Sequence, residues 1–86
     1  MEIIYSDEAR EDIEYWKKTK NIKIQLKISE LLHSITETPF LGIGKPEPLK
    51  HKLRGKWSRR INSEHRVIYS ISESYIIIHS LRGHYV

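Results

Sequence analysis

The chain has 86 residues, of which 15 are Lys or Arg and 11 are Asp or Glu, so its formal charge at pH 7 is +4. A chain of this length forms a single small domain, residues 1–86, with no room for a separate cofactor domain. It contains no cysteine, which excludes disulfides, thiol nucleophiles and cysteine-ligated zinc.

Neither a membrane span nor a secretion signal is expected from the sequence. The longest purely aliphatic run is Ile76–Ile78, whereas a membrane-spanning helix needs about 20 apolar residues. Residues 1–3 lack the basic and then apolar start of a signal peptide. Together with the absence of cysteine, these features predict a cytoplasmic protein with no membrane partner.

A short strand at residues 2–5 and a first helix are expected at the start of the chain. Ser6 is followed by Asp7 and Glu8. This order is typical of a helix start, because serine caps free N–H groups and acids favour the positive end of the helix dipole. Apolar residues then recur with helical spacing and form one face: Ala9, Ile13 and Trp16.

A second helix is predicted from about Asn21 to about Thr36. It ends before Pro39, because the residue that precedes a proline avoids the α region. Its apolar residues form one stripe that is expected to face the core: Ile24, Ile28, Leu31, Leu32 and Ile35.

From Leu49 onward the pattern alternates, as in strands. Residues 49–53 form a plausible first strand, followed by strands at 57–61, 65–72 and 75–81, with turn residues between them. Such short connections favour an antiparallel meander. In the strand at 57–61, the alternation places Trp57, Arg59 and Ile61 on one face.

The predicted fold class is α+β, in the order β-α-α-β-β-β. Two N-terminal helices pack on one face of a twisted, largely antiparallel sheet. The other face is left to polar and basic residues of the late strands, and such a face is suited to nucleic acid.

Most of the excess positive charge lies between Lys45 and Arg66. This segment contains eight Lys and Arg residues but only two acidic residues, a distribution typical of a surface that binds a polyanion such as RNA. One of the two acids, Glu47, lies between two prolines, whose fixed φ gives the carboxylate a rigid mounting. Glu47 is either a catalytic carboxylate or a counter-ion of Lys45 or Lys50.

Metal-free RNA cleavage is the chemistry that these residues favour. The sequence lacks a G-x-S-x-G nucleophile elbow and the convergent ligands of a metal site, so no cofactor or metal is expected. Attack by the ribose 2′-OH needs only a base, an acid and cations around the phosphate. A carboxylate such as Glu47, a histidine and arginines supply these groups, and the product is a 2′,3′-cyclic phosphate.

Several motifs carry a resemblance to a known family. They are GKPEPLKH at 44–51, GxWSRRI at 55–61, EHRxxY at 64–69 and HY at 84–85, with YW at 15–16 and TPF at 38–40. In this order they resemble the YoeB (Txe/YoeB) toxins of bacterial toxin–antitoxin modules, within the RelE-like superfamily. The similarity extends over essentially the whole chain.

The resemblance implies a RelE-like, microbial-ribonuclease-type fold and a ribosome-dependent mRNA interferase that cleaves mRNA in the ribosomal A site. Glu47 matches the family's proposed general base and Arg66 its phosphate-stabilising arginine. His84 matches the general acid, and Tyr85 the tyrosine that orients or stacks on the substrate.

The same motifs contain four predicted RNA contacts: Lys50, His51, Arg59 and Arg60. Of these, Lys50 and Arg60 match basic residues of the family that position RNA. The resemblance also implies a YefM- or Phd-like antitoxin that wraps the toxin and displaces its C-terminal catalytic residues. The sequence leaves open whether the protein forms a homodimer.

Two other functions remain open on the sequence alone. A basic surface suffices for a non-catalytic module that binds RNA or the ribosome and blocks translation by occupancy. An inactive toxin that acts as an antitoxin-binding corepressor is compatible with the same residues.

Overall fold

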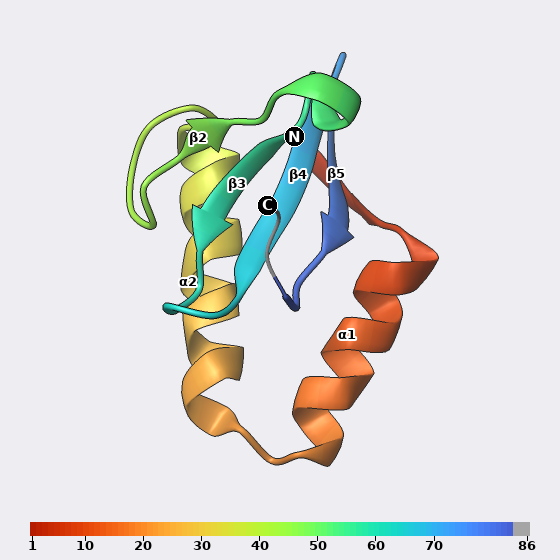
Figure 1. Cartoon of the computed structure of the whole chain (residues 1–86), viewed down its shortest axis with the longest axis vertical. Coiled ribbons are helices and arrows are strands. Elements are labelled where there is room, and N and C mark those ends of the chain that lie inside the picture. Colours follow the sequence, from red (N-terminus) through yellow and green to blue (C-terminus); the bar gives the residue numbers. More distant parts are fainter. Residues whose placement is uncertain (84–86) are drawn as a thin grey trace.

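A computed structural model describes residues 1–83 of the chain. In chain order the elements are β1 (Glu2–Tyr5), α1 (Asp7–Lys18), α2 (Ile22–Glu37), β2 (Glu47–Pro48), the 3-10 helix η1 (His51–Leu53), β3 (Trp57–Arg60), β4 (Arg66–Ser72) and β5 (Tyr75–Ser80). Figure 1 shows the strands gathered into one twisted sheet, with both long helices in the first half of the chain. Across residues 1–83, no helix combines the length and apolar character that crossing a membrane requires.

The five strands form a single sheet in the order β1-β5-β4-β3-β2. The neighbours from β2 to β5 are antiparallel, whereas β1 runs parallel to β5. A parallel pair needs a long crossover connection, and α1 and α2 lie within the connection that leaves β1. The predicted α+β class and the largely antiparallel sheet are confirmed.

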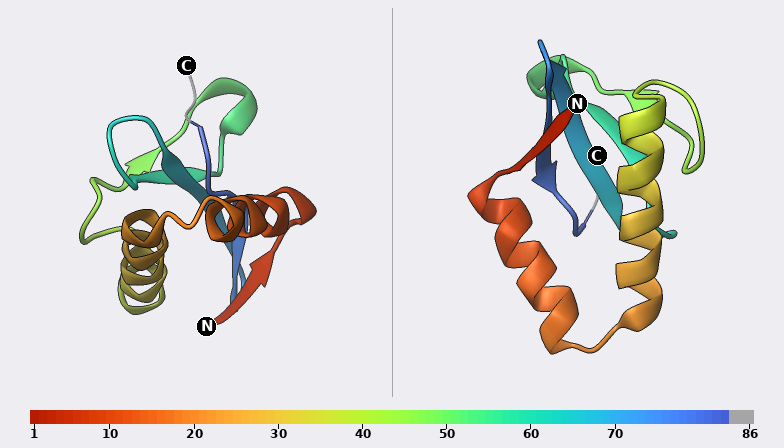
Figure 2. Two further views of the ribbon diagram at one scale, coloured as in Figure 1. Left: turned by 90° about the horizontal axis from the view of Figure 1, so that it is seen from below. Right: turned by 180° about the vertical axis from the view of Figure 1, so that it is seen from behind.

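The two helices pack against one face of the sheet. In the right-hand view of Figure 2, α2 lies in front of the strands, and α1 contacts β5, α2 and β1. The apolar stripes predicted for both helices supply half of the core, at roughly 1.5 to 3 kcal/mol for each large side chain that is fully buried. The buried core residues are Ala9, Trp16, Ile24, Ile28, Leu31, Ile35, Ile61, Val67, Tyr69, Ile76, Ile78 and Leu81.

Both predicted helix starts are confirmed by their caps. The Ser6 hydroxyl accepts a hydrogen bond from the Ala9 N–H at 3.0 Å, and the Asn21 side chain accepts one from the Ile24 N–H at 3.1 Å. Ser6 also donates its own hydroxyl proton to the His79 carbonyl at 2.8 Å. This second bond ties the start of α1 to β5.

The strand predicted at residues 49–53 is wrong. The only residues of this region that pair with β3 as a strand are Glu47 and Pro48, and His51–Leu53 form a 3-10 turn. The backbone of this turn forms local hydrogen bonds, and the Leu53 N–H donates to the Lys50 carbonyl at 3.1 Å. The alternation of apolar and basic residues was misleading because Leu49 and Leu53 are also spaced for one turn of helix.

Candidate active site

The sheet register brings the predicted catalytic carboxylate and two arginines to one region of the sheet face that lies opposite the helices. Glu47 pairs with Ser58, and Arg60 pairs with Arg66. Paired residues lie on the same side of a sheet, as do alternate residues of one strand. Glu47, Arg60 and Arg66 therefore share the face opposite the helices, across β2, β3 and β4.

Glu47 is exposed and lies on the edge strand β2. Its counter-ion interpretation requires an ion pair with Lys45 or Lys50. Within residues 1–83, none of the ion pairs shorter than 4.0 Å includes Glu47. Its carboxylate is therefore exposed, has no ion-pair partner in the described part of the chain and is accessible to a ligand.

Arg60 and Arg66 lie directly opposite each other across β3 and β4. Two like charges in this position destabilise a sheet, and in the described part of the chain no acidic side chain pairs with either. Arg66 is half-buried, and its Nη1 donates to the Asn62 carbonyl at 2.8 Å and to the His65 carbonyl at 3.1 Å. These bonds fix the guanidinium and leave Nε and Nη2 without a partner among residues 1–83. A phosphate would relieve the repulsion and accept from these donors.

The structure places Arg59 in the protein core and not on the surface where an RNA contact was predicted. Its side chain is 0% exposed, because it points to the core side of β3, opposite to Arg60. Every nitrogen of its guanidinium donates a hydrogen bond within the protein. The acceptors are the Tyr69 hydroxyl at 3.2 Å, the Ser34 hydroxyl at 2.7 Å, and the carbonyls of Thr38 at 2.6 Å, Leu41 at 2.7 Å and Ile43 at 3.1 Å.

Arg59 instead holds the loop that leads to Glu47. Three of its acceptors are carbonyl groups of residues 38–43. The Tyr69 hydroxyl, which accepts from Arg59, donates to another carbonyl of this loop, that of Pro39, at 2.6 Å. Burial raises the pKa of Tyr69, although the hydrogen bond and the charge of Arg59 act in the opposite direction. The buried guanidinium thus supplies the loop with hydrogen bonds that water would otherwise provide.

Gly44 lets this loop pass close to the core. Its φ is +83°, and a Cβ at this position would lie 2.7 Å from Cδ2 of Leu31. The Gly44 carbonyl accepts from the Arg60 N–H at 2.6 Å. Gly44, three residues before Glu47, therefore serves close packing and the junction with β3.

The other two predicted RNA contacts, Lys50 and His51, are exposed at the start of η1. Neither forms an ion pair with an acidic residue in the part of the chain that the structure describes. They follow β2 within three residues, and their contact with RNA stays a prediction.

Comparison with known proteins identifies the family. Residues 5–85 match the family described as "YoeB-like toxin of bacterial type II toxin-antitoxin system". The chain belongs to this family of toxins. Toxin YoeB of Escherichia coli (strain K12) is 47% identical over 85 residues, which cover 99% of this chain and 100% of that protein.

Solved structures agree with this assignment. A YoeB/ParE toxin from Agrobacterium tumefaciens superposes with a TM-score of 0.94 at 39% identity, covering 99% of this chain and 100% of that one. A YoeB–YefM complex from Staphylococcus aureus contains a chain with a TM-score of 0.89 at 45% identity, covering 99% and 98%. The expected RelE-like fold of the toxin is confirmed.

The predicted residues His84 and Tyr85 lie outside the described residues of the toxin. The last described residue, Gly83, accepts a hydrogen bond from the backbone N–H of Arg66 at 2.9 Å. The chain thus reaches the arginine pair one residue before His84.

Two polar features of the toxin were missed by sequence reasoning. Ser70 and His79 form a hydrogen bond of 2.8 Å between β4 and β5, and burial, with a smaller contribution from the charge of Lys56, lowers the pKa of His79. Asp12 is buried on the apolar side of α1. Its spacing of three and four residues from Ala9 and Trp16 was a readable signal, whereas the Ser70–His79 pairing depends on a strand register that the sequence does not give.

Proposed function

We propose that this toxin is a ribosome-dependent, metal-independent endoribonuclease that cleaves mRNA in the ribosomal A site and so inhibits translation. One observation carries the proposal: Glu47, an exposed carboxylate with no ion pair within residues 1–83, shares one sheet face with the opposed arginines Arg60 and Arg66. An anionic substrate would balance the arginine pair, and the carboxylate beside it would act as a base. This site would work in the cytoplasm, where ribosomes hold mRNA.

The chemistry needs no group that the chain lacks. Glu47 takes the proton of the ribose 2′-OH, whose oxygen forms a bond to the adjacent phosphorus. The bond from phosphorus to the 5′ oxygen breaks, and His84 protonates that oxygen. The products are a 2′,3′-cyclic phosphate and a 5′-hydroxyl end.

The remaining residues bind and orient the substrate in this proposal. Arg66 and Arg60 stabilise the negative charge that grows on the phosphate oxygens in the transition state. Strands β2 and β4 are separated by two spacings of about 4.8 Å, and Arg66 lies opposite Arg60, two residues from the Ser58 that pairs with Glu47. Glu47 and Arg66 therefore lie diagonally across β3, and a sugar-phosphate unit would bind between their side chains. Lys50 and His51 hold the neighbouring backbone, and Tyr85 orients a base.

Primer extension on ribosome-bound mRNA tests the proposal. The wild-type toxin should create new 5′ ends at defined codons, and Glu47→Gln should abolish them. Glu73→Gln is the matched control, because Glu73 is also exposed but lies in the turn between β4 and β5. Undiminished cleavage by both Glu47→Gln and His84→Ala would sink the assignment. Arrest of translation without new 5′ ends would favour a module that acts by occupancy.

An antitoxin partner is part of the same proposal. The Staphylococcus aureus relative has been solved in a complex with YefM and also as a YoeB dimer, the latter with a TM-score of 0.89 at 44% identity. We therefore expect a YefM-like antitoxin to bind this toxin and to suppress mRNA cleavage, and the free toxin to form a homodimer. Titration of the cleavage reaction with the antitoxin, and light scattering of the free toxin, test the two expectations.

A further inference from the structure

The segment Leu81–Gly83 is held in place by residues from α1 and from the start of β4. It lies beyond the end of β5, outside the sheet ladder. On the α1 side, the Leu81 N–H donates to Oδ2 of Asp12 at 2.9 Å, and Nε1 of Trp16 donates to the Leu81 carbonyl at 3.0 Å. Both polar groups of this peptide residue are therefore bound by side chains of one helix.

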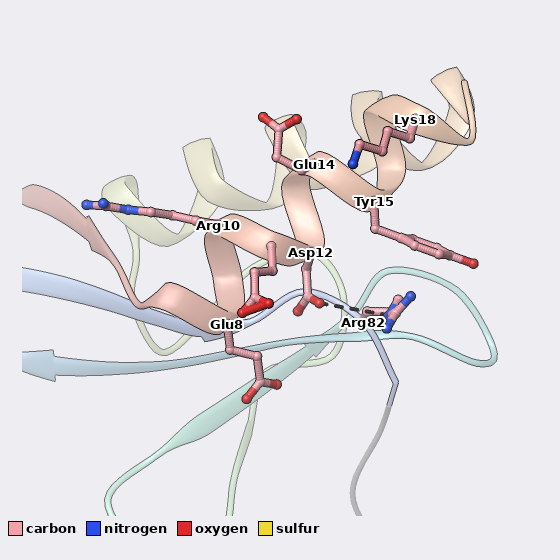
Figure 3. A pocket seen from close by; sticks show the side chains of 8 residues that line it. Glu8, Arg10, Asp12, Glu14, Tyr15, Lys18 and Arg82 are labelled. Carbon is pink, nitrogen blue, oxygen red and sulfur yellow. Dashed lines mark ion pairs between the residues drawn. The ribbon is translucent and has the colours of Figure 1, made fainter.

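Asp12 also reaches the next residue of the segment. Its Oδ1 lies 3.8 Å from Nε of Arg82, and the Arg82 guanidinium lies 4.0 Å from the centre of the Tyr15 ring. Figure 3 shows Asp12 pointing from α1 toward Arg82, beside the open hollow that these side chains line. Helix α1 thus holds Leu81 through two hydrogen bonds. It holds Arg82 through the charge of Asp12 and a cation–π contact with the Tyr15 ring.

The third residue, Gly83, is held by two consecutive residues, His65 and the first residue of β4, Arg66. Its N–H donates to Nδ1 of His65 at 2.9 Å, and its carbonyl accepts from the Arg66 N–H at 2.9 Å. The His65 ring packs edge-on against Trp16, with ring centres 4.9 Å apart. The first bond requires an unprotonated Nδ1 on His65, and the ring that carries it is fixed by Trp16.

A carboxylate is an unusual choice for the position of Asp12. Only 6% of Asp12 is exposed, and it is one of the few polar residues buried among residues 1–83. Burial of a charge carries a desolvation penalty that an apolar side chain of similar size would avoid. Among residues 1–83, the contacts that offset this penalty lead to the backbone of Leu81 and to the side chain of Arg82.

We propose that Asp12, Trp16 and His65 are positioning residues that fix the backbone of Leu81–Gly83 and thereby set where His84 enters the active site. The inference rests on the proposed function, in which His84 donates the proton to the leaving oxygen. A catalytic group contributes fully only when it is held close to its reacting geometry, and a displacement of about 1 Å can cost a factor of about 100 in rate. The anchor ends one peptide bond before His84, where such a constraint has its greatest effect.

Two pairs of substitutions, each with one variant that keeps an acceptor and one that removes it, test the hydrogen bonds. His65→Asn keeps an acceptor atom at the place of Nδ1, whereas His65→Leu keeps the bulk and removes the acceptor. Asp12→Asn and Asp12→Leu make the same comparison for the Leu81 N–H. We expect each Leu variant to lower kcat about 10- to 100-fold with little change in KM, and each Asn variant to stay close to wild type.

A double-mutant cycle with His84→Ala shows whether the effect passes through His84. If it does, adding His65→Leu to His84→Ala causes no further loss, because the anchor then positions a group that is already gone. Equal losses in both backgrounds, or a wild-type kcat for His65→Leu, would overturn the inference. His65→Ser, which also lacks an acceptor at Nδ1, takes the place of His65→Leu if thermal unfolding shows that the Leu variant does not fold.

Hydrogen exchange at the Leu81 and Gly83 amides supplies a readout that does not depend on cleavage. His65→Leu should lose protection at Gly83 and keep it at Leu81, and Asp12→Leu should show the reverse; unchanged protection in both would overturn the inference. A wild-type toxin that fails to cleave mRNA sinks the proposed function. If the wild-type toxin cleaves mRNA and the Leu variants are fully active, the positioning role is disproved and the proposed function is not.

Discussion

Arg59 and Arg60 are neighbours in β3, and their side chains lie on opposite faces of the sheet. Arg59 is buried and donates to five acceptors in the core and the loop at 38–43. Arg60 is exposed and lies opposite Arg66. The same type of side chain thus supports the fold at one position and forms part of the candidate active site at the next.

We expect Arg59→Ala to lower the free energy of unfolding by about 3 kcal/mol or more, because it leaves buried acceptors without donors. Arg60→Ala should change stability by no more than about 0.5 kcal/mol and should weaken mRNA cleavage. Urea denaturation of both variants gives the comparison. Equal losses of stability would contradict the two assignments.

Arg66→Ala should lower kcat by a factor of about 100 to 1,000, or roughly 3 kcal/mol of transition-state stabilisation, if the guanidinium contacts the reacting phosphate. Stability should fall little, since the substitution also removes the repulsion with Arg60. Arg66→Lys is the matched control: it keeps the charge but loses the planar set of donors, so activity should recover only in part. Single-turnover cleavage of ribosome-bound mRNA measures both variants. A fully active Arg66→Ala toxin would exclude this role.

Gly44→Ala and Gly55→Ala separate close packing from backbone strain. Both glycines have positive φ, +83° and +94°, but an added Cβ meets Leu31 at 2.7 Å in the first case and nothing within 4 Å in the second. Gly55→Ala should therefore lower the free energy of unfolding by about 1 kcal/mol, because alanine disfavours the left-handed conformation. Gly44→Ala should lower it by about 1 to 3 kcal/mol more, because its Cβ also overpacks the core. Thermal unfolding monitored by circular dichroism gives both values, and equal costs would disprove the packing argument.

Acid should destabilise the toxin partly through His79. Burial and the Lys56 charge lower the pKa of His79 in the folded protein, whereas the unfolded value is about 6.5. Its contribution to stability is therefore present above about pH 6.5 and is lost as the pH falls through the lower folded pKa.

His79→Gln should reduce the loss of stability between about pH 7.5 and pH 5. The exposed His33, whose contact with Glu37 spans 3.8 Å, provides the control substitution His33→Gln, which should leave that loss nearly unchanged. Chemical denaturation at several pH values gives the slopes. The same pH dependence in wild type and His79→Gln would refute the prediction.

Local signals explain what could be predicted about the fold. The caps at Ser6 and Asn21 and the apolar stripes of α1 and α2 depend on residues a few positions apart, and the structure confirms them. The turn at His51–Leu53 was missed because its spacing fits a strand and a helical turn equally well. The parallel pairing of β1 with β5 depends on contacts more than 70 residues apart in the chain.

The candidate site was predicted by residue type and motif, but its geometry depends on tertiary structure. Glu47, Arg60 and Arg66 share a face only because of the register of β2, β3 and β4. The predicted RNA contact of Arg59 conflicted with the alternation that already placed it beside Trp57 and Ile61. Asp12 was overlooked because a single acidic residue in a helix is usually solvated, and its partner Leu81 lies 69 positions away.

The place of β5 between β1 and β4 affects the order in which the toxin assembles during its own synthesis. Every other described element precedes β5 in the chain, so the ribosome makes this strand after them. A nascent chain that has reached Ser72 already contains Glu47, Arg60 and Arg66, yet β1 has no neighbour to pair with and α1 lacks the strand on which it packs. Completion of the sheet therefore waits for β5, which delays the folded toxin relative to the synthesis of most of its active-site residues.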